Sequence, residues 1–296
     1  MKKLNHWIAL LLGVILLFSA SIASASITPL PLDSDVGATH PWKKENRLGE
    51  DKLEYKDESI HVKVERFRHN GLKYIVAYVD IVDPSQIRTA ASYGTYDDHR
   101  YVKTKIIAKS VNSIVCVNGD FFKYNDFGYL VRQCQLLRER PDAEHDVLLI
   151  DNMGDFHVLT LPTLDDINQY IANMEEGRFV VNSFNFGPIL IQDGVVLEPE
   201  TKFYQSTKKQ QRVAIVQRGP LSYAIVQADG KTDSTVGINL KKFAVAIKEI
   251  IPDAQIAYNL DGGGSAHVVY LDKTLNSNSS SRSICDILYF ASIADE

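Results

Sequence analysis

Short segments with strand character, separated by tight turns, recur from residue 60 to residue 291, and this feature restricts the fold most. Residues 60–67 and 74–82 alternate in polarity or are rich in β-branched side chains, which is typical of strands. Asp193-Gly194 is a hairpin turn dipeptide between two apolar runs. Further strands are predicted at residues 113–117, 147–150, 157–160, 179–181, 189–191, 195–196, 212–217, 223–227, 256–260, 267–271 and 287–291.

Residues 240–251 predict an amphipathic helix, because apolar side chains recur there at three- and four-residue spacing. Ser234 or Thr235 could cap this helix, and Pro252 ends it. Helical spacing is also present at residues 101–109 and 164–174. Strands outnumber helices, and many are joined by tight turns. The predicted fold is therefore α+β, a single domain with a mixed, largely antiparallel β-sheet core and packing helices.

The first 25 residues have the pattern of a secretory signal peptide. Lys2 and Lys3 precede an apolar run over residues 8–18, and small residues at 23–25 suggest cleavage after Ala25. An uncleaved anchor helix is the alternative, and no later stretch predicts a membrane span. Residues 26–55 are rich in Pro, Asp, Lys and Glu, which predicts a poorly ordered lead-in. The expected domain covers residues 56–296, in a secreted or periplasmic protein.

Charge excludes some classes of partner. Removing residues 1–25 takes away two lysines and no acids, so the formal charge moves from -5 to -7. An acidic protein of this kind is a poor candidate for binding nucleic acid or an anionic membrane surface.

Three cysteines follow the leader, at positions 116, 134 and 285. In an oxidising compartment two of them could pair, and Cys116 with Cys134 would close the shorter loop. Three buried thiols are an equal alternative. Their spacing does not predict a zinc site.

The segment Asn259-Leu260-Asp261-Gly262-Gly263-Gly264-Ser265 is the strongest chemical signal. Three consecutive glycines contribute no side chains, so a sharp bend or a close approach of the backbone is expected. Exposed N–H groups of such a bend can bind an anionic oxygen. A tight turn without a ligand is the alternative. The segment lacks the Lys of a phosphate-binding loop and lies between strands, unlike a dinucleotide fingerprint.

This glycine turn, preceded by a helix and a short apolar strand, resembles the signature of the phosphodiester glycosidase family. Residues 117–122, 186–194 and 211–215 resemble further family segments in the same order, and the match spans roughly residues 60–293. Three positions depart from the family pattern: Asp120, Val213 and Val216. The resemblance implies a hydrolase that cleaves the sugar–phosphate bond of a sugar-1-phosphodiester, on an envelope or extracellular polysaccharide. The departures keep open a non-catalytic protein of the same fold that binds carbohydrate or is associated with exopolysaccharide or the cell envelope.

The reaction needs a carboxylate near the anomeric carbon and a cationic or N–H-rich cradle for the phosphate. Asp261 is the first candidate for the carboxylate and Asp120 the second. The candidates for binding sugar or phosphate are Asn118, Arg212, Gly262, Gly263, Gly264, Ser265 and Arg282. Asp120 and Asp261 together could hold a divalent cation, but no ligand spacing demands one, so no cofactor is predicted.

Each candidate has a structural alternative. Arg212 could form a surface ion pair, and Arg282 could be a solvated charge in a Ser/Asn-rich loop. Asp261 could cap its turn, and Asp120 could be a solvated turn residue. Asn118 could adopt a left-handed conformation. Separate alternatives apply to three neighbours: His267 is expected to be a structural histidine, and Phe121 and Phe122 are expected to lie in the core.

Overall fold

The computed structural model describes residues 27–34, 37–48, 53–98, 100–198, 205–230, 236–276 and 281–295. The expected signal peptide and the expected helix caps Ser234 and Thr235 lie outside these residues. In the described part of the chain, no helix combines the length and the apolar character that crossing a membrane requires.

The described elements are three α-helices, four 3-10 helices and eighteen strands. The α-helices are α1 (Thr104–Ser110), α2 (Leu164–Ala172) and α3 (Leu240–Ile250), and the 3-10 helices are η1 (Lys44–Asn46), η2 (Pro84–Gln86), η3 (Ser92–Gly94) and η4 (Gly263–Ser265). The first nine strands are β1 (Glu54–Lys56), β2 (Ile60–His69), β3 (Leu72–Ile81), β4 (Ile87–Ala91), β5 (Val115–Asn118), β6 (Gly128–Arg132), β7 (Gln135–Arg140), β8 (Val147–Asp151) and β9 (Phe156–Leu159). The others are β10 (Val180–Phe184), β11 (Ile189–Gln192), β12 (Val195–Val196), β13 (Arg212–Gly219), β14 (Ser222–Ala228), β15 (Ile256–Asn259), β16 (Val268–Tyr270), β17 (Lys273–Thr274) and β18 (Asp286–Phe290).

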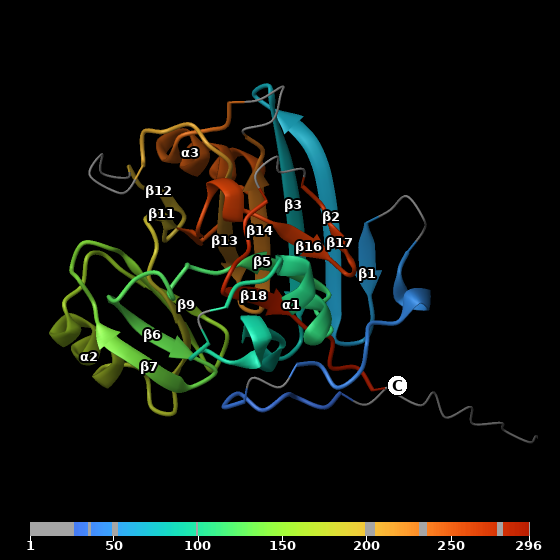
Figure 1. Cartoon of the computed structure of the whole chain (residues 1–296), viewed down its shortest axis with the longest axis horizontal. Coiled ribbons are helices and arrows are strands. Elements are labelled where there is room, and N and C mark those ends of the chain that lie inside the picture. The colour runs from blue at the N-terminus through green and yellow to red at the C-terminus, as the bar shows by residue number, and fades with distance from the viewer. Residues whose placement is uncertain are drawn as a thin grey trace, which may run out of the picture.

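Two antiparallel sheets form the body of the molecule (Figure 1). The larger sheet has the order β1-β2-β3-β14-β13-β15-β11-β12, and the smaller has the order β17-β16-β5-β18-β4. Every ladder between the described strands is antiparallel, as in the long β2–β3 hairpin and the β13–β14 pair. This confirms the α+β class and shows a sheet more uniform than the mixed one that the sequence suggested.

The two sheets pack face to face, and a helix covers each outer face. One face of β13 and β14 contributes Val213, Ile215 and Ile225 to a core shared with Val117 and Leu288 of the smaller sheet. Side chains that alternate with these face α3, whose buried stripe is centred on residues 243–247. Helix α1 covers the smaller sheet on its other side. Alternation along each strand thus divides its side chains between an inner and an outer core.

A smaller lobe built from β6 to β10 and α2 lies beside the sandwich (Figure 1, lower left). Strands β10, β8 and β9 form one sheet, and the β6–β7 hairpin lies against β10. Ile167 of α2 packs with Tyr129, Val131, Val147 and Leu149 in the core of this lobe. Strands β6 and β7 were not predicted, because residues 128–140 carry charges at alternating and adjacent positions that obscure the period.

The described part of the lead-in packs against the body, which corrects the expectation of a poorly ordered segment. Leu30 and Ala38 are buried in the core beneath α1, and the N–H of Leu30 donates to the hydroxyl of Ser85. The buried guanidinium of Arg88 donates to carbonyls of Pro31 and Ser34. Composition alone missed this, because the lead-in is held by groups of the body rather than by its own periodicity.

Two local predictions have clear outcomes. Helix α3 is capped by Asn239, whose side chain accepts a hydrogen bond from the N–H of Lys242. The expected caps lie too far upstream of its first turn. The three cysteines are free thiols, so the structure favours the alternative without a disulfide. Cys116 and Cys285 are buried, and Cys134 is half-buried.

Candidate active site

The glycine turn carries the chain from the larger sheet to the smaller one, because it joins β15 to β16. Gly263 has a φ of +58°, which favours glycine, and its N–H donates to the carbonyl of Gln211 at 2.8 Å. A Cβ on Gly262 would lie 2.8 Å from that same carbonyl oxygen. The close approach of the turn to the residue before β13 therefore requires glycine at position 262, and the backbone conformation favours glycine at position 263.

Asn118 fixes the turn from both sides. This residue ends β5, next to β16 in the smaller sheet, and its side chain is buried. Its Nδ2 donates to the carbonyl of Asp261 at 2.8 Å, and its Oδ1 accepts from the N–H of His267 at 3.2 Å. Asn118 lies in extended backbone rather than in the left-handed region. The geometry makes it a positioning residue for the turn.

Asp261 is a buried carboxylate with incomplete hydrogen bonding. Its Oδ2 has no hydrogen-bond partner among the described residues. Burial raises the pKa of Asp261 to about 6, while hydrogen bonds from the Ser265 side chain and the Gly262 backbone, with the charge of Arg282, oppose the rise. A buried acid with a displaced pKa at a polar turn is characteristic of catalytic groups.

Ser265 and Arg282 complete the polar group around Asp261. The Arg282 Nη1 donates to the Ser265 hydroxyl at 3.3 Å and lies 3.9 Å from Asp261 Oδ2. The N–H of Arg282 donates to the carbonyl of Gly264, which ties the arginine to the turn. About half of the Arg282 side chain is exposed, so its guanidinium can meet an incoming anion. The alternative of a purely solvated charge does not describe this residue.

Arg212 lies beside the turn, but its guanidinium faces the backbone. A Cβ on Gly262 would lie 3.7 Å from the Arg212 Cδ, so the two segments are in contact distance. The Arg212 Nη2 donates to the carbonyls of Gln205 and Lys208, and its Nε donates to that of Ile238. Arg212 is buried, so it is neither a surface ion pair nor a free phosphate ligand. Its observed contacts make it a support for the loops around the turn.

Asp120 is also buried, and both of its carboxylate oxygens are occupied. Its Oδ1 accepts from Arg132 Nη2 at 2.8 Å, and its Oδ2 accepts from the N–H of Asn185 at 2.9 Å. Arg132 also binds Asp286 at 2.9 Å, which forms a three-residue ion cluster. Asp120 is therefore not a solvated turn residue, and its contacts do not favour a second catalytic carboxylate.

No local pattern pointed to Arg132 or Asp286, although Arg132 pairs with both Asp120 and Asp286. A Cβ on Gly119 would lie 2.3 Å from Asp286 Oδ1, so the glycine after Asn118 is needed for this close contact. The cluster joins the end of β5 to β6 and β18. An isolated arginine in an irregular strand has no local pattern that would reveal such partners.

The amides of the triglycine segment are not all available to a ligand. The Gly263 N–H donates to Gln211, and the Ser265 N–H donates to the carbonyl of Gly262. The Gly262 N–H supports the Asp261 carboxylate. An anion nest made of all three glycine amides is thus not favoured. The glycines serve mainly to bend the chain and hold Asp261.

His267 behaves as the expected structural histidine on one side. Its Nδ1 lies 3.3 Å from the Thr104 hydroxyl, and burial lowers its pKa. Its Nε2 is buried without a hydrogen-bond partner in the described residues. His267 directly follows the turn and therefore fixes the start of β16.

Aromatic rings extend from the polar group toward the surface. The Arg282 guanidinium lies 5.8 Å from the ring of Phe121, and that ring stacks on Tyr124 with centroids 3.9 Å apart. Tyr101 lies 5.1 Å from Tyr124. Tyr124 is exposed and Phe121 is half-buried, whereas Phe122 lies in the core as expected. The sequence prediction placed Phe121 in the core, because it did not foresee its partly exposed stack.

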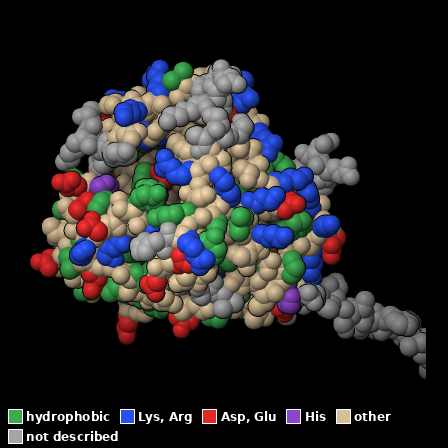
Figure 2. Space-filling view, viewed as in Figure 1, with side chains coloured by type: hydrophobic (Ala, Val, Ile, Leu, Met, Phe, Trp, Pro, Cys, Tyr) green, Lys and Arg blue, Asp and Glu red, His purple; other side chains and the backbone are tan. Residues whose placement is uncertain are grey.

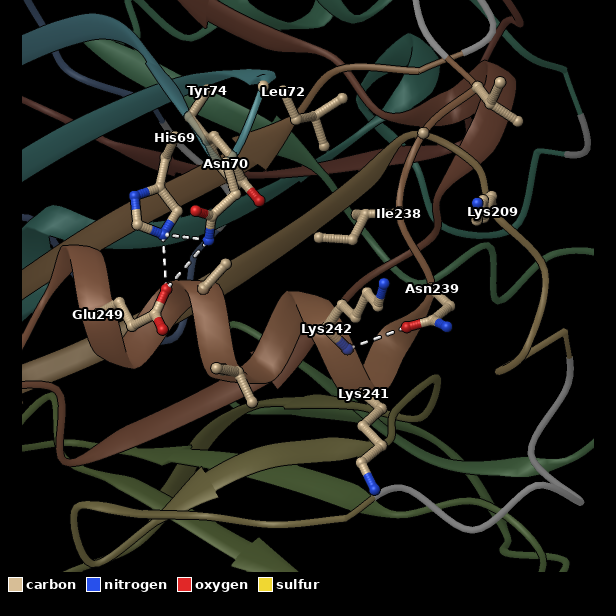
Figure 3. A pocket seen from close by; sticks show the side chains of 15 residues that line it. His69, Asn70, Leu72, Tyr74, Lys209, Ile238, Asn239, Lys241, Lys242 and Glu249 are labelled. Carbon is tan, nitrogen blue, oxygen red and sulfur yellow. Dashed lines mark hydrogen bonds and ion pairs between the residues drawn. The ribbon is translucent and has the colours of Figure 1, made fainter.

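A cavity of about 750 Å³ lies between the β2–β3 hairpin and α3 (Figure 3). Glu249, which lines this cavity, pairs with His69, with 2.6 Å between Oε2 and Nε2. Lys209, Lys241 and Lys242 line the part of the cavity near the start of α3 (Figure 3). The residues of the glycine turn do not line this cavity. It is separate from the group around Asp261.

Charge is unevenly distributed on the face shown in Figure 2. Lys and Arg gather on its right half, toward β2 and β3, and Asp and Glu gather along its left and lower edge. Among the described residues, no group of three or more His, Cys, Asp or Glu side chains could hold a metal ion. Both carboxylate oxygens of Asp120 accept hydrogen bonds within the protein, from Arg132 and from the N–H of Asn185.

The fold and the site define a two-sheet sandwich protein whose buried acid is held on a glycine bend that crosses between the sheets. The family model for phosphodiester glycosidase matches residues 112–291, which is more than half of the chain. The chain belongs to the phosphodiester glycosidase family.

Solved structures share this fold. The catalytic domain of zebrafish N-acetylglucosamine-1-phosphodiester alpha-N-acetylglucosaminidase, auto-inhibited by its pro-peptide, aligns with a TM-score of 0.62 and 16% identity over 88% of this chain and 97% of that chain. A hypothetical protein from Synechocystis aligns with a TM-score of 0.55 and 15% identity over 78% of this chain and 62% of that chain. A candidate exported protein from Burkholderia pseudomallei K96243 aligns with a TM-score of 0.50 and 14% identity over 75% of this chain and 74% of that chain. The chain has no match among curated proteins.

Proposed function

We propose that this protein is a hydrolase that cleaves the bond between sugar C1 and phosphate oxygen in a sugar-1-phosphodiester. The observation that carries the proposal is the buried Asp261 carboxylate, which has one oxygen without a hydrogen-bond partner and an exposed guanidinium beside it. Family membership and the substrate named for the zebrafish enzyme support this class of substrate.

Asp261 is the group proposed to act at the anomeric carbon. With a pKa of about 6, it is mostly ionised at neutral pH and can stabilise or attack an oxocarbenium-like centre. Its low hydration strengthens this interaction, because the surrounding protein screens charge less than water does. Ser265 and Gly262 orient the carboxylate through hydrogen bonds.

One carboxylate suffices because of the leaving group. A phosphomonoester whose second pKa is about 6 leaves with little help from a general acid. This agrees with the contacts of Asp120, which is committed to Arg132. Arg282 is the group proposed to neutralise the departing phosphate, since it is exposed and is held beside Asp261 by Ser265 and Gly264.

The aromatic stack of Phe121 and Tyr124 is proposed to bind the sugar. An aromatic ring offers an apolar face to the C–H side of a pyranose, and polar groups beside it fix the orientation. Arg282 lies over Phe121, so the stack begins where the proposed phosphate site ends. This placement would put C1 of the sugar between the stack and Asp261.

The proposed setting is outside the cytoplasm, on an envelope or extracellular polysaccharide. The leader pattern of residues 1–25 and the description of the Burkholderia neighbour as a candidate exported protein support it.

Hydrolysis in H₂¹⁸O tests the proposal, because it shows which bond breaks. Sugar-1-phosphate alkyl diesters with hexose and N-acetylhexosamine are the substrates, and mass spectrometry locates the label. Cleavage at C1 places ¹⁸O on the sugar and leaves the phosphate unlabelled. Label in the phosphate, or no turnover across the panel, would overturn the proposal.

A further inference from the structure

A second cavity, of about 370 Å³, opens between the sheets near the free end of the β2–β3 hairpin. Its volume is that of a site for one small molecule. Arg66, Arg68 and Lys73 line it together with the acid Asp229 and the buried amide Gln227. Arg66 and Arg68 continue the inward face of β2 beyond Val62 and Val64, which lie in the core.

Gln227 is the unusual member of this group. It is fully buried, and neither its Nε2 nor its Oε1 has a hydrogen-bond partner among the described residues. Leaving a buried polar group without a partner costs about 1–3 kcal/mol, so the presence of this amide needs an explanation, and a bound polar molecule is one. In register, Gln227 lies between Val213 and Ile75 on the inner face of the larger sheet.

The cations that line the cavity are available to a ligand. In the described part of the chain, Arg66 and Lys73 form no ion pair, and Arg68 donates to the carbonyl of Gly71 in its own hairpin. Burial raises the pKa of Asp229, although Lys73 and the Gly230 N–H oppose the rise. Three positive charges, a carboxyl and an amide with a free donor and a free acceptor suit an anion that also carries hydroxyl groups.

Hydrogen bonds link the cavity to the end of the glycine turn. Asn276 lines the cavity, and its Nδ2 donates to the carbonyl of Ala266, the residue after Ser265. The Gln211 side chain donates to the same carbonyl. Gln211 directly precedes β13, the strand that pairs with β14. We propose that this cavity is an accessory binding site for an anionic saccharide, a monosaccharide that carries a phosphate or carboxylate. The proposal uses only the contacts of the cavity and does not need the proposed hydrolysis.

Isothermal titration calorimetry tests the site with glucose 6-phosphate as the probe and with glucose and inorganic phosphate as separate arms. The Asp261→Asn variant is used, so that turnover cannot contribute heat. Glucose 6-phosphate is expected to bind at least about tenfold more tightly than either arm, since charge and hydroxyl contacts act together. Equal binding of inorganic phosphate would overturn the saccharide part, and no binding of any probe would overturn the site.

Variants locate the binding. Arg66→Ala and Lys73→Ala are each expected to weaken glucose 6-phosphate about tenfold, whereas Lys63→Ala should not, because Lys63 lies on β2 outside the cavity and pairs with Glu65. Gln227→Leu should weaken the probe while leaving the melting temperature unchanged or higher, since it removes an unpaired buried amide. A lower melting temperature with unchanged affinity would show that Gln227 is structural and would contradict the proposal. Because binding is read directly, this failure is distinct from a failure of the ¹⁸O experiment.

Discussion

At the scale of single residues, the site depends on what each charged group already contacts. Arg212 and Arg282 are the same residue type at the same turn, yet one donates to three backbone carbonyls and the other is half exposed. Asp120 and Asp261 differ in the same way: one has both oxygens occupied, and the other has a free oxygen. Occupied hydrogen-bonding capacity therefore separates supporting residues from candidates for chemistry.

The raised pKa of Asp261 predicts that this acid lowers the free energy of unfolding to an extent that depends on pH. The folded protein holds the Asp261 proton more tightly than the unfolded chain, so the free energy of unfolding falls as pH rises from about 4 to about 6. A shift from 3.8 to about 6 corresponds to about 3 kcal/mol. Asp261→Asn is therefore expected to be more stable than the wild type at pH 8 by up to about 3 kcal/mol, with little difference below pH 4.

Urea unfolding at pH 4 and pH 8 measures this effect. Asp272→Asn is the matched control, because Asp272 is an exposed acid just after β16. A loss of stability in Asp261→Asn at pH 8 would show that the acid contributes to folding rather than opposing it.

At the scale of elements, the site lies where the chain passes from the larger sheet to the smaller one, between β15 and β16. The bend after β15 passes so close to the residue before β13 that position 262 has no room for a side chain. Gly262→Ala is expected to lower both stability and turnover, because its Cβ would lie 2.8 Å from the Gln211 carbonyl oxygen. A loss of about 1–3 kcal/mol is expected from the enforced backbone shift.

Thermal unfolding and turnover of Gly262→Ala are compared with those of Gly219→Ala. Gly219 has open space where its Cβ would be, and it lies at the end of β13 away from the bend. Equal effects of the two substitutions would mean that contact with β13 does not shape the turn.

The ion cluster of Arg132 with Asp120 and Asp286 connects β5, β6 and β18. Arg132→Met would leave two buried carboxylates without their cation and should lower the free energy of unfolding by about 3–5 kcal/mol at pH 7. The loss should shrink as pH falls, because burial raises the pKa of Asp286 and its protonation removes one of the unpaired charges.

Chemical denaturation of Arg132→Met between pH 4 and pH 8 measures this loss. Arg140→Met, at the exposed end of β7, is the control on the same hairpin. A pH-independent loss of the same size would mean that packing rather than charge explains the effect.

At the scale of the whole molecule, local patterns of the sequence were enough for most of the sandwich. The β11–β12 and β13–β14 hairpins and the stripe of α3 depend on neighbouring residues, and the structure confirms them. Two antiparallel sheets and their helices follow from such local units. The glycine bend could also be recognised from the sequence, since no other stretch of it has three consecutive glycines.

The environment of the charged residues could not be predicted, because it depends on distant partners. Arg132 reaches Asp286, which is 154 positions away, and Asn118 reaches Asp261 across 143 positions. The roles expected for Asp120 and Arg212 changed for this reason. In the lead-in, the contacts of Leu30 likewise come from residues of the body.

The central claim is that the buried carboxylate at the glycine bend performs the chemistry. Initial rates with a sugar-1-phosphodiester, measured for the wild type, Asp261→Asn and Asp272→Asn, test it most directly. We expect Asp261→Asn to lower kcat by at least about a thousandfold, while Asp272→Asn should match the wild type. Full activity of Asp261→Asn would contradict the claim, and so would a loss of the same size in Asp272→Asn.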